Sequence, residues 1–136
     1  MVTRVPKEQL AGHRGQNDDM ERIIAVSRDT VGSKNLYSRI VRTAAGGRTE
    51  VHHHGECETS IYILRGHARF YSGDALRDVI DAHEGDFVYV PAHEVHVEEN
   101  ASATASLVVL LSRNCAGPVV HYVDATPPTR SDAPVP

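Results

Sequence analysis

The chain has 136 residues and a net charge of −4 when its nine histidines are neutral. This length is typical of one domain, and a domain of this size buries enough surface to fold without a framework of disulfides. Because the sequence has no basic cluster and no apolar run of about 20 residues, we expect neither nucleic-acid binding nor a membrane span.

The chain begins with a polar stretch, residues 1–22, which we interpret as an N-terminal arm that either crosses onto a neighbouring subunit or frays. We interpret residues 16–24 as a short helical turn. The remainder, from residue 23 to residue 123, consists of short β runs separated by glycine-containing turns. The predicted strands cover residues 23–27, 35–44, 59–66, 67–73, 76–81, 86–91, 95–100, 105–111 and 118–123. This spacing favours an all-β sandwich or barrel.

The end of the chain, residues 124–136, contains four of the seven prolines and little that can be buried. We expect it to be a tail that is either disordered or loosely draped over the barrel. The two cysteines, Cys57 and Cys115, lie far apart; one disulfide is an option, but the low count favours free thiols in a reducing compartment. Since the first ten residues contain no apolar run suited to a signal peptide, the sequence predicts a cytoplasmic protein.

The stretch VHHHGECE, residues 51–58, is dense in metal-ligating side chains. In a strand, His52 and His54 share one face and His53 points the other way. Two imidazoles on one face, about 6.6 Å apart at Cα, can both reach an ion at the usual distance of about 2.0–2.1 Å. The alternative is a solvated patch that binds nothing. The apolar run IYIL that follows favours the metal site, because it places the histidines beside buried structure.

Residues 46–66 resemble the first motif of the cupin superfamily, G-x5-H-x-H-x3,4-E-x6-G, and residues 85–100 resemble the second, G-x5-P-x-G-x2-H-x3-N. The resemblance implies a cupin double-stranded β-helix, a jelly-roll β-barrel, over residues 23–123. It also implies that one divalent transition metal is bound per chain, namely iron, manganese, nickel, copper or zinc. The implied ligands are His52, His54, Glu58 and His96.

The match departs from the motifs at two positions. Seven residues separate Glu58 from Gly66 where the family has six, so either a β-bulge re-aims Glu58 or Glu58 is not a ligand. The longer spacing of the motif falls on Thr59, which is no strong ligand. His93 stands where the family has glycine. It either tolerates a left-handed turn or lines the pocket mouth, where it is the candidate catalytic residue.

Three further side chains are assigned to a substrate pocket: Arg39, Tyr62 and Phe87. An arginine that points inward from a strand would bind a substrate carboxylate well. The resemblance implies an enzyme acting on a small organic molecule, of dioxygenase type in the first instance and otherwise an isomerase or lyase. A non-catalytic binding or sensing protein and a metal-free epimerase-like barrel are the alternatives. Exposed strand edges and the N-terminal arm predict a homodimer.

Overall fold

The computed structural model describes residues 1–10, 12–14 and 19–130. The short helices are η1 (Lys7–Gln9), α1 (Arg28–Val31) and η2 (Asp74–Leu76). The strands are β1 (Gly12–Arg14), β2 (Met20–Val26), β3 (Tyr37–Thr43), β4 (His52–His53), β5 (Thr59–Arg65), β6 (His67–Ser72), β7 (Asp78–His83), β8 (Phe87–Val90), β9 (Val97–Asn100), β10 (Leu107–Arg113) and β11 (His121–Tyr122). The expected all-β class is therefore confirmed.

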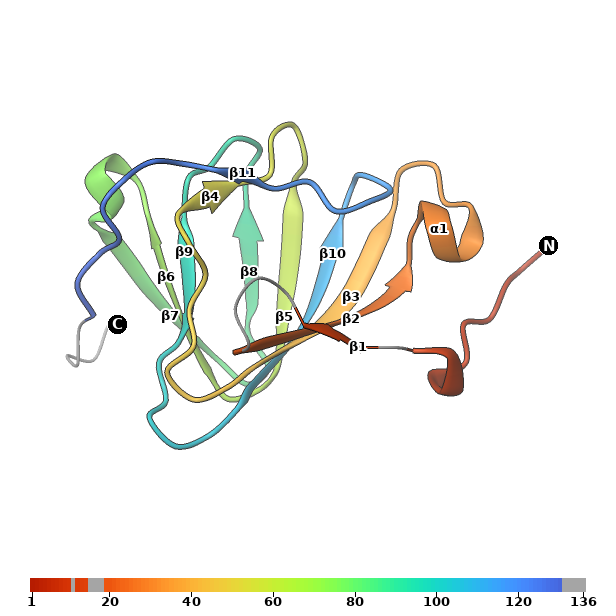
Figure 1. The fold of residues 1–136 in the computed structure, drawn as a ribbon, viewed down its shortest axis with the longest axis horizontal. Helices are drawn as coiled ribbons and strands as arrows, with labels where there is room; N and C mark the ends of the chain where they lie inside the picture. The colour runs from red at the N-terminus through yellow and green to blue at the C-terminus, as the bar shows by residue number, and fades with distance from the viewer. Residues whose placement is uncertain (11, 15–18, 131–136) are drawn as a thin grey trace.

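The strands form an antiparallel barrel (Figure 1). One wall is a six-stranded sheet in the order β1-β2-β3-β10-β5-β8, and the other is a three-stranded sheet in the order β7-β6-β9. The β4–β11 pair lies between the two walls, and an isolated bridge between His52 and His96 ties β4 to the segment that leads into β9. This jelly-roll arrangement brings both histidine segments to the inside of one barrel.

The barrel is filled by the inward-facing side chains of both walls. In β3 every second residue is buried, as the two-residue period of a strand requires. The main core cluster is Met20, Tyr37, Val41, Ile61, Ile63, Ala68, Phe70, Ala82, Val88, Val90, Leu107, Val109 and Leu111. A second cluster, Val51, Tyr71, Leu76 and Val97, lies on the outer side of the three-stranded sheet. Among the described residues, no helix has the length and apolar character needed to cross a membrane.

One prediction for the N-terminal part of the chain is wrong. The helical turn predicted for residues 16–24 is wrong where the structure describes it, because Met20–Val26 is strand β2, paired along β3. Residues 15–18 lie outside the described residues. The arm contributes β1, which pairs with β2 of the same chain. Its possible exchange with a neighbouring subunit therefore stays a prediction.

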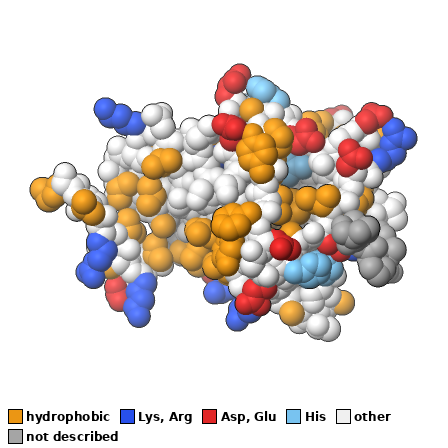
Figure 2. All heavy atoms as spheres, turned by 180° about the vertical axis from the view of Figure 1, so that it is seen from behind, with side chains coloured by type: hydrophobic (Ala, Val, Ile, Leu, Met, Phe, Trp, Pro, Cys, Tyr) orange, Lys and Arg blue, Asp and Glu red, His pale blue; other side chains and the backbone are white. Residues whose placement is uncertain are grey.

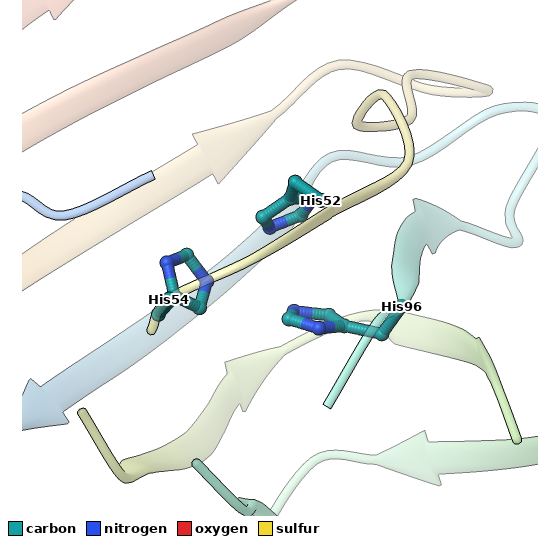
Figure 3. A group of neighbouring side chains, drawn as sticks. All are labelled: His52, His54 and His96. Atoms are coloured by element: carbon teal, nitrogen blue, oxygen red, sulfur yellow. The ribbon is translucent and has the colours of Figure 1, made fainter. Parts of the chain in front are cut away.

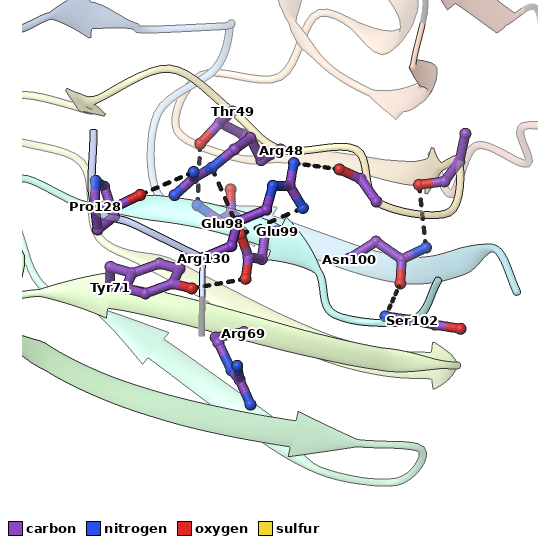
Figure 4. Close-up of polar contacts among 12 residues, drawn as sticks. Arg48, Thr49, Arg69, Tyr71, Glu98, Glu99, Asn100, Ser102, Pro128 and Arg130 are labelled. Atoms are coloured by element: carbon purple, nitrogen blue, oxygen red, sulfur yellow. Dashed lines mark hydrogen bonds and ion pairs between the residues drawn. The ribbon is translucent and has the colours of Figure 1, made fainter. Parts of the chain in front are cut away.

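The start of the predicted tail, residues 124–130, lies against the barrel (Figure 4). Arg48 Nη1 donates to the carbonyl oxygen of Pro128 at 3.0 Å. Arg130 lies 3.7 Å from Glu99, which is buried and also accepts a hydrogen bond of 2.7 Å from the Tyr71 hydroxyl. These contacts cover the second core cluster on its outer side. Residues 131–136 lie outside the described residues.

The prediction of two free thiols is wrong, because Cys57 and Cys115 form a disulfide. The register of β5 and β10 explains it. Thr59 pairs with Arg113, and each cysteine lies two residues beyond that pair, on the same side of it. The Cα atoms are consequently 5.9 Å apart, within the usual range for a disulfide. The sequence did not indicate this disulfide, because the two cysteines are 58 residues apart and only the pairing of β5 with β10 brings them together.

Candidate metal centre

Three buried histidines converge inside the barrel: His52, His54 and His96. Their potential ligand atoms all lie within 4.8 Å of one another, and each residue is 5% exposed or less. Figure 3 shows the three rings turned toward a shared space, two from the β4 segment and one from the segment before β9. His52 and His96 are held opposite each other by reciprocal backbone hydrogen bonds of 3.2 and 2.9 Å. The convergence predicted from the sequence is therefore present.

The backbone selects one nitrogen of each ring for the interior. The Nδ1 atoms of His52, His54 and His96 lie 2.7, 2.6 and 2.8 Å from the carbonyl oxygens of Glu50, Val119 and Glu94. Because a carbonyl can only accept, each Nδ1 carries the proton and donates it. Each Nε2 then keeps its lone pair, which is the arrangement that metal-ligating histidines commonly show. The donor set fits a divalent transition metal.

Burial keeps His52 and His54 neutral. The pKa of His52 is lowered to about 4, first by burial and then by the neighbouring His96. Burial, followed by the charge of Arg113, lowers the pKa of His54 to about 3. Both imidazoles therefore offer an unprotonated nitrogen at neutral pH, which metal binding requires.

Glu58 does not join the histidines, contrary to the expected ligand set. Its carboxylate is on the outer surface, where it accepts hydrogen bonds from the Tyr89 hydroxyl at 2.6 Å and from Asn114 Nδ2 at 3.0 Å. Thr59 is the inward residue, 2% exposed, and six residues separate it from Gly66 as in the motif. The β-bulge on this pair of strands is at Val108 and Val109, far from Glu58, so nothing turns the carboxylate inward.

His93 also lies outside the barrel. Its φ of 62° is the left-handed conformation that the motif's glycine would adopt. The side chain is 59% exposed, and its Nε2 lies 3.2 Å from Glu56. Tyr62 and Phe87 likewise point outward, with their rings 4.6 Å apart on the surface of the six-stranded sheet and Phe87 73% exposed. The catalytic role of His93 and the pocket roles of Tyr62 and Phe87 are therefore not supported by their positions.

A cavity of about 870 Å³, its open mouth included, runs beside the histidines. Arg39 lines it, in agreement with the sequence-based assignment. The cavity also contains two side chains that the sequence analysis missed, Arg22 and Glu98. Strand alternation was the available signal for Glu98, since it lies two residues after His96 and so shares its face. The signal for Arg22 was hidden by the mistaken helical turn.

Comparison with known proteins agrees with this geometry. The model of the family described as "Cupin domain" matches residues 39–112, which is more than half of the chain. The chain belongs to the cupin family. In sequence, it is 30% identical over 111 residues to a "Probable oxalate decarboxylase" of Arthroderma benhamiae. That alignment covers 80% of this cupin but only 26% of the fungal protein, so the chain spans about a quarter of the relative's length.

Solved structures share the fold at low sequence identity. The polyketide cyclase RemF from Streptomyces resistomycificus superposes with a TM-score of 0.75 at 19% identity, covering 93% of this chain and 88% of the cyclase. The Lactobacillus farciminis oxalate decarboxylase in its formate complex gives a TM-score of 0.72 at 18% identity, covering 85% of this chain and 34% of the decarboxylase. These similarities support the jelly-roll cupin fold and leave the chemistry to the site itself.

Proposed function

We propose that this cupin is a metal-dependent enzyme that converts a small organic molecule inside the barrel. The observation that carries the proposal is the set of three buried imidazoles whose Nδ1 atoms are all held by backbone carbonyls. His52, His54 and His96 would hold one divalent ion of iron, manganese, nickel, copper or zinc. Such an ion supplies Lewis-acid chemistry or, for the redox-active metals, oxygen chemistry.

The chain's own residues would bind the substrate and move its protons. Arg39 would orient an anionic group of the substrate. Glu98 is the carboxylate best placed for general acid–base work, because it lines the same cavity and its charge acts on His52. Phe70, Val109 and Leu111 exclude water from the inner end of the cavity.

The reaction type is the second part of the proposal. A dioxygenase is the reaction first expected, whereas the relatives described above are named as decarboxylases and a cyclase. A dioxygenase consumes oxygen, a decarboxylase releases carbon dioxide, and a cyclase need do neither. Assays of one panel of small organic acids, with the metal found in the native protein, distinguish the three reaction types. No turnover across the panel with any of the five metals would favour a binding or sensing protein instead.

Elemental analysis of the purified protein tests the metal site. We expect about one transition-metal ion per chain, and we expect His96→Ala to lose it together with any activity. Glu58→Ala is the matched control, because its carboxylate is outside the barrel. This variant should retain the ion, although the first motif has a carboxylate ligand. Full metal occupancy in His96→Ala, or metal loss in Glu58→Ala alone, would contradict the assignment.

A further inference from the structure

The inner wall of the barrel carries more positive charge than its own carboxylates balance. Arg22 and Arg39 line the cavity, and Arg113 lies beside His54 with its Nη2 3.4 Å from the ring Nε2. Of the acidic side chains that line the same cavity, Glu50 is exposed, and Glu99 accepts from Tyr71 on the far side of the sheet. Among the described residues, Glu98 is thus the one lining carboxylate left to face the guanidinium groups of Arg22 and Arg39, and Arg113 adds a third buried positive charge beside His54.

Two of these arginines form a pair across one aromatic ring. The guanidinium carbons of Arg39 and Arg113 lie 5.6 and 5.8 Å from the ring centroid of Tyr37. The strand register produces this arrangement, because Tyr37 is paired with Arg113, and Arg39 is the next inward residue on β3. Both arginines are buried, at 8% and 2% exposure. Two buried like charges around one ring raise the free energy of the protein, and an anionic ligand reduces this cost.

Each arginine of the pair has one N–H donor without an acceptor. Among the described residues, Arg39 Nε and Arg113 Nη1 are buried without a hydrogen-bond partner. Arg113 is otherwise fixed, since its Nε donates to Thr59 Oγ1 at 3.0 Å. A buried donor without an acceptor is costly, so Arg39, which lines the cavity, is suited to a ligand that brings an oxygen atom to its Nε.

The rest of the cavity wall is apolar. Val41, Phe70, Leu107, Val109 and Leu111 line it beside the arginines. A fully polar anion would leave these side chains against water, whereas a ligand with a hydrocarbon or aromatic body would cover them.

We propose that the cavity binds an organic acid with an apolar body, whose carboxylate is held by Arg39 beside the buried charge of Arg113 and whose body lies against the aliphatic wall. This inference rests on the proposed function for its location beside the three histidines. It adds the substrate class, and it predicts discrimination against both neutral molecules and small inorganic or fully polar anions.

Isothermal titration of the purified protein with 3-phenylpropionate tests the proposal. The matched probe is 3-phenylpropionamide, which has the same shape and no charge. We expect the acid to bind at least about tenfold more tightly than the amide, because charge-assisted hydrogen bonds to the buried Arg39 are then formed. Oxalate and inorganic phosphate should bind more weakly than 3-phenylpropionate. Equal affinity for acid and amide, or tighter binding of oxalate or phosphate, would overturn the proposal.

Arg39→Met removes the charge at similar side-chain length and should abolish the preference for the acid. Arg42→Met is the control on the same strand, since Arg42 points outward and is 51% exposed. Undiminished binding of the amide by Arg39→Met shows that the cavity is intact. Arg39→Lys keeps the charge but lacks the planar guanidinium, so its preference for the acid over the amide should be intermediate. This second variant tests the proposal even if Arg39→Met does not fold. A preference unchanged in both Arg39 variants would refute the assignment.

Metal content separates this proposal from the proposed function. The titrations are run on the protein as purified and again after removal of metal with a chelator. If the acid is preferred but elemental analysis finds no transition metal, the metal-dependent function fails and the organic-acid site stands. If about one ion per chain is found but acid and amide bind alike, the organic-acid site fails and the metal centre stands.

Discussion

At the scale of single residues, the site depends on histidines that are buried and neutral. His52 and His54 reach pKa values of about 4 and 3 in the folded protein, against about 6.5 when exposed in the unfolded chain. At these two positions the unfolded chain therefore binds more protons than the folded protein between pH 6.5 and pH 4. Their contribution to stability must rise with pH across this window and fall as the solution is acidified.

The first prediction is a pH dependence with this sign. In metal-free protein, the free energy of unfolding measured with urea should decrease as the pH falls from 7 to 4.5. Most of that decrease should disappear in the double variant His52→Gln, His54→Gln, because glutamine does not titrate. Carboxylates that titrate near pH 4 are present in both proteins, so the difference between the wild type and the double variant isolates the two histidines. An equally steep decrease in the double variant would contradict the prediction.

Residue-level inference from the sequence succeeded where one local rule decides the outcome. Strand alternation was enough to direct His52 and His54 inward and His53 outward. It failed for Glu58 because one extra residue before Gly66 decides which side chain faces inward, and Thr59 takes that place. Arg113 was not foreseen because its position opposite Tyr37 follows from the pairing of β3 with β10, which the sequence does not display.

At the scale of elements, most strands were predicted to within two or three residues, since short β runs between turn-forming residues have a strong local pattern. Their pairing was not predictable in the same way. The order β3-β10-β5 joins segments that lie far apart in the sequence, and only this order brings Cys57 next to Cys115. The disulfide also lies close in sequence to both partners of one hydrogen bond in the histidine cluster, because Cys57 follows His54 by three residues and Cys115 precedes Val119 by four.

The second prediction concerns this disulfide. The double variant Cys57→Ser, Cys115→Ser releases a loop closed over a sequence separation of 58 residues. On the chain-entropy account, this loss costs about 4 kcal/mol of stability. Urea unfolding of the variant and of the wild type at one pH measures the difference. Treatment of the wild type with a reducing agent should reproduce the lowered midpoint and leave the variant unaffected. Identical midpoints for the variant and the untreated wild type would contradict the prediction.

At the scale of the whole molecule, the outer face of the six-stranded sheet carries an apolar row. Neighbouring strands pair its members in register from one side of the sheet to the other. The row is Ile23, Ile40, Leu110, Tyr62 and Phe87. Figure 2 shows hydrophobic side chains gathered across the middle of the molecule, seen from behind. An apolar surface of this extent on a soluble protein commonly marks an interface.

The neighbouring row of the same face explains why a second copy of the chain suits it. Ser38, Ser112 and Ser60 pair side by side across β3, β10 and β5. Their side chains are small, which permits another sheet to approach closely over these three strands. In a twofold dimer both subunits present the same surface. The homodimer expected from the sequence therefore becomes a proposal with a specified face.

The third prediction is that the protein is a dimer whose stability depends on the centre of this row. Light scattering after size exclusion should give about twice the chain mass of 14.9 kDa. Leu110→Asp places a charge at the middle of the row and should shift the mass toward the monomer, since an unpaired charge is costly to bury. Ile80→Asp is the control, because Ile80 is 48% exposed on β7 in the other sheet. It should leave the mass unchanged. A monomeric wild type would refute the dimer, and dissociation by Ile80→Asp rather than Leu110→Asp would move the interface to the three-stranded sheet.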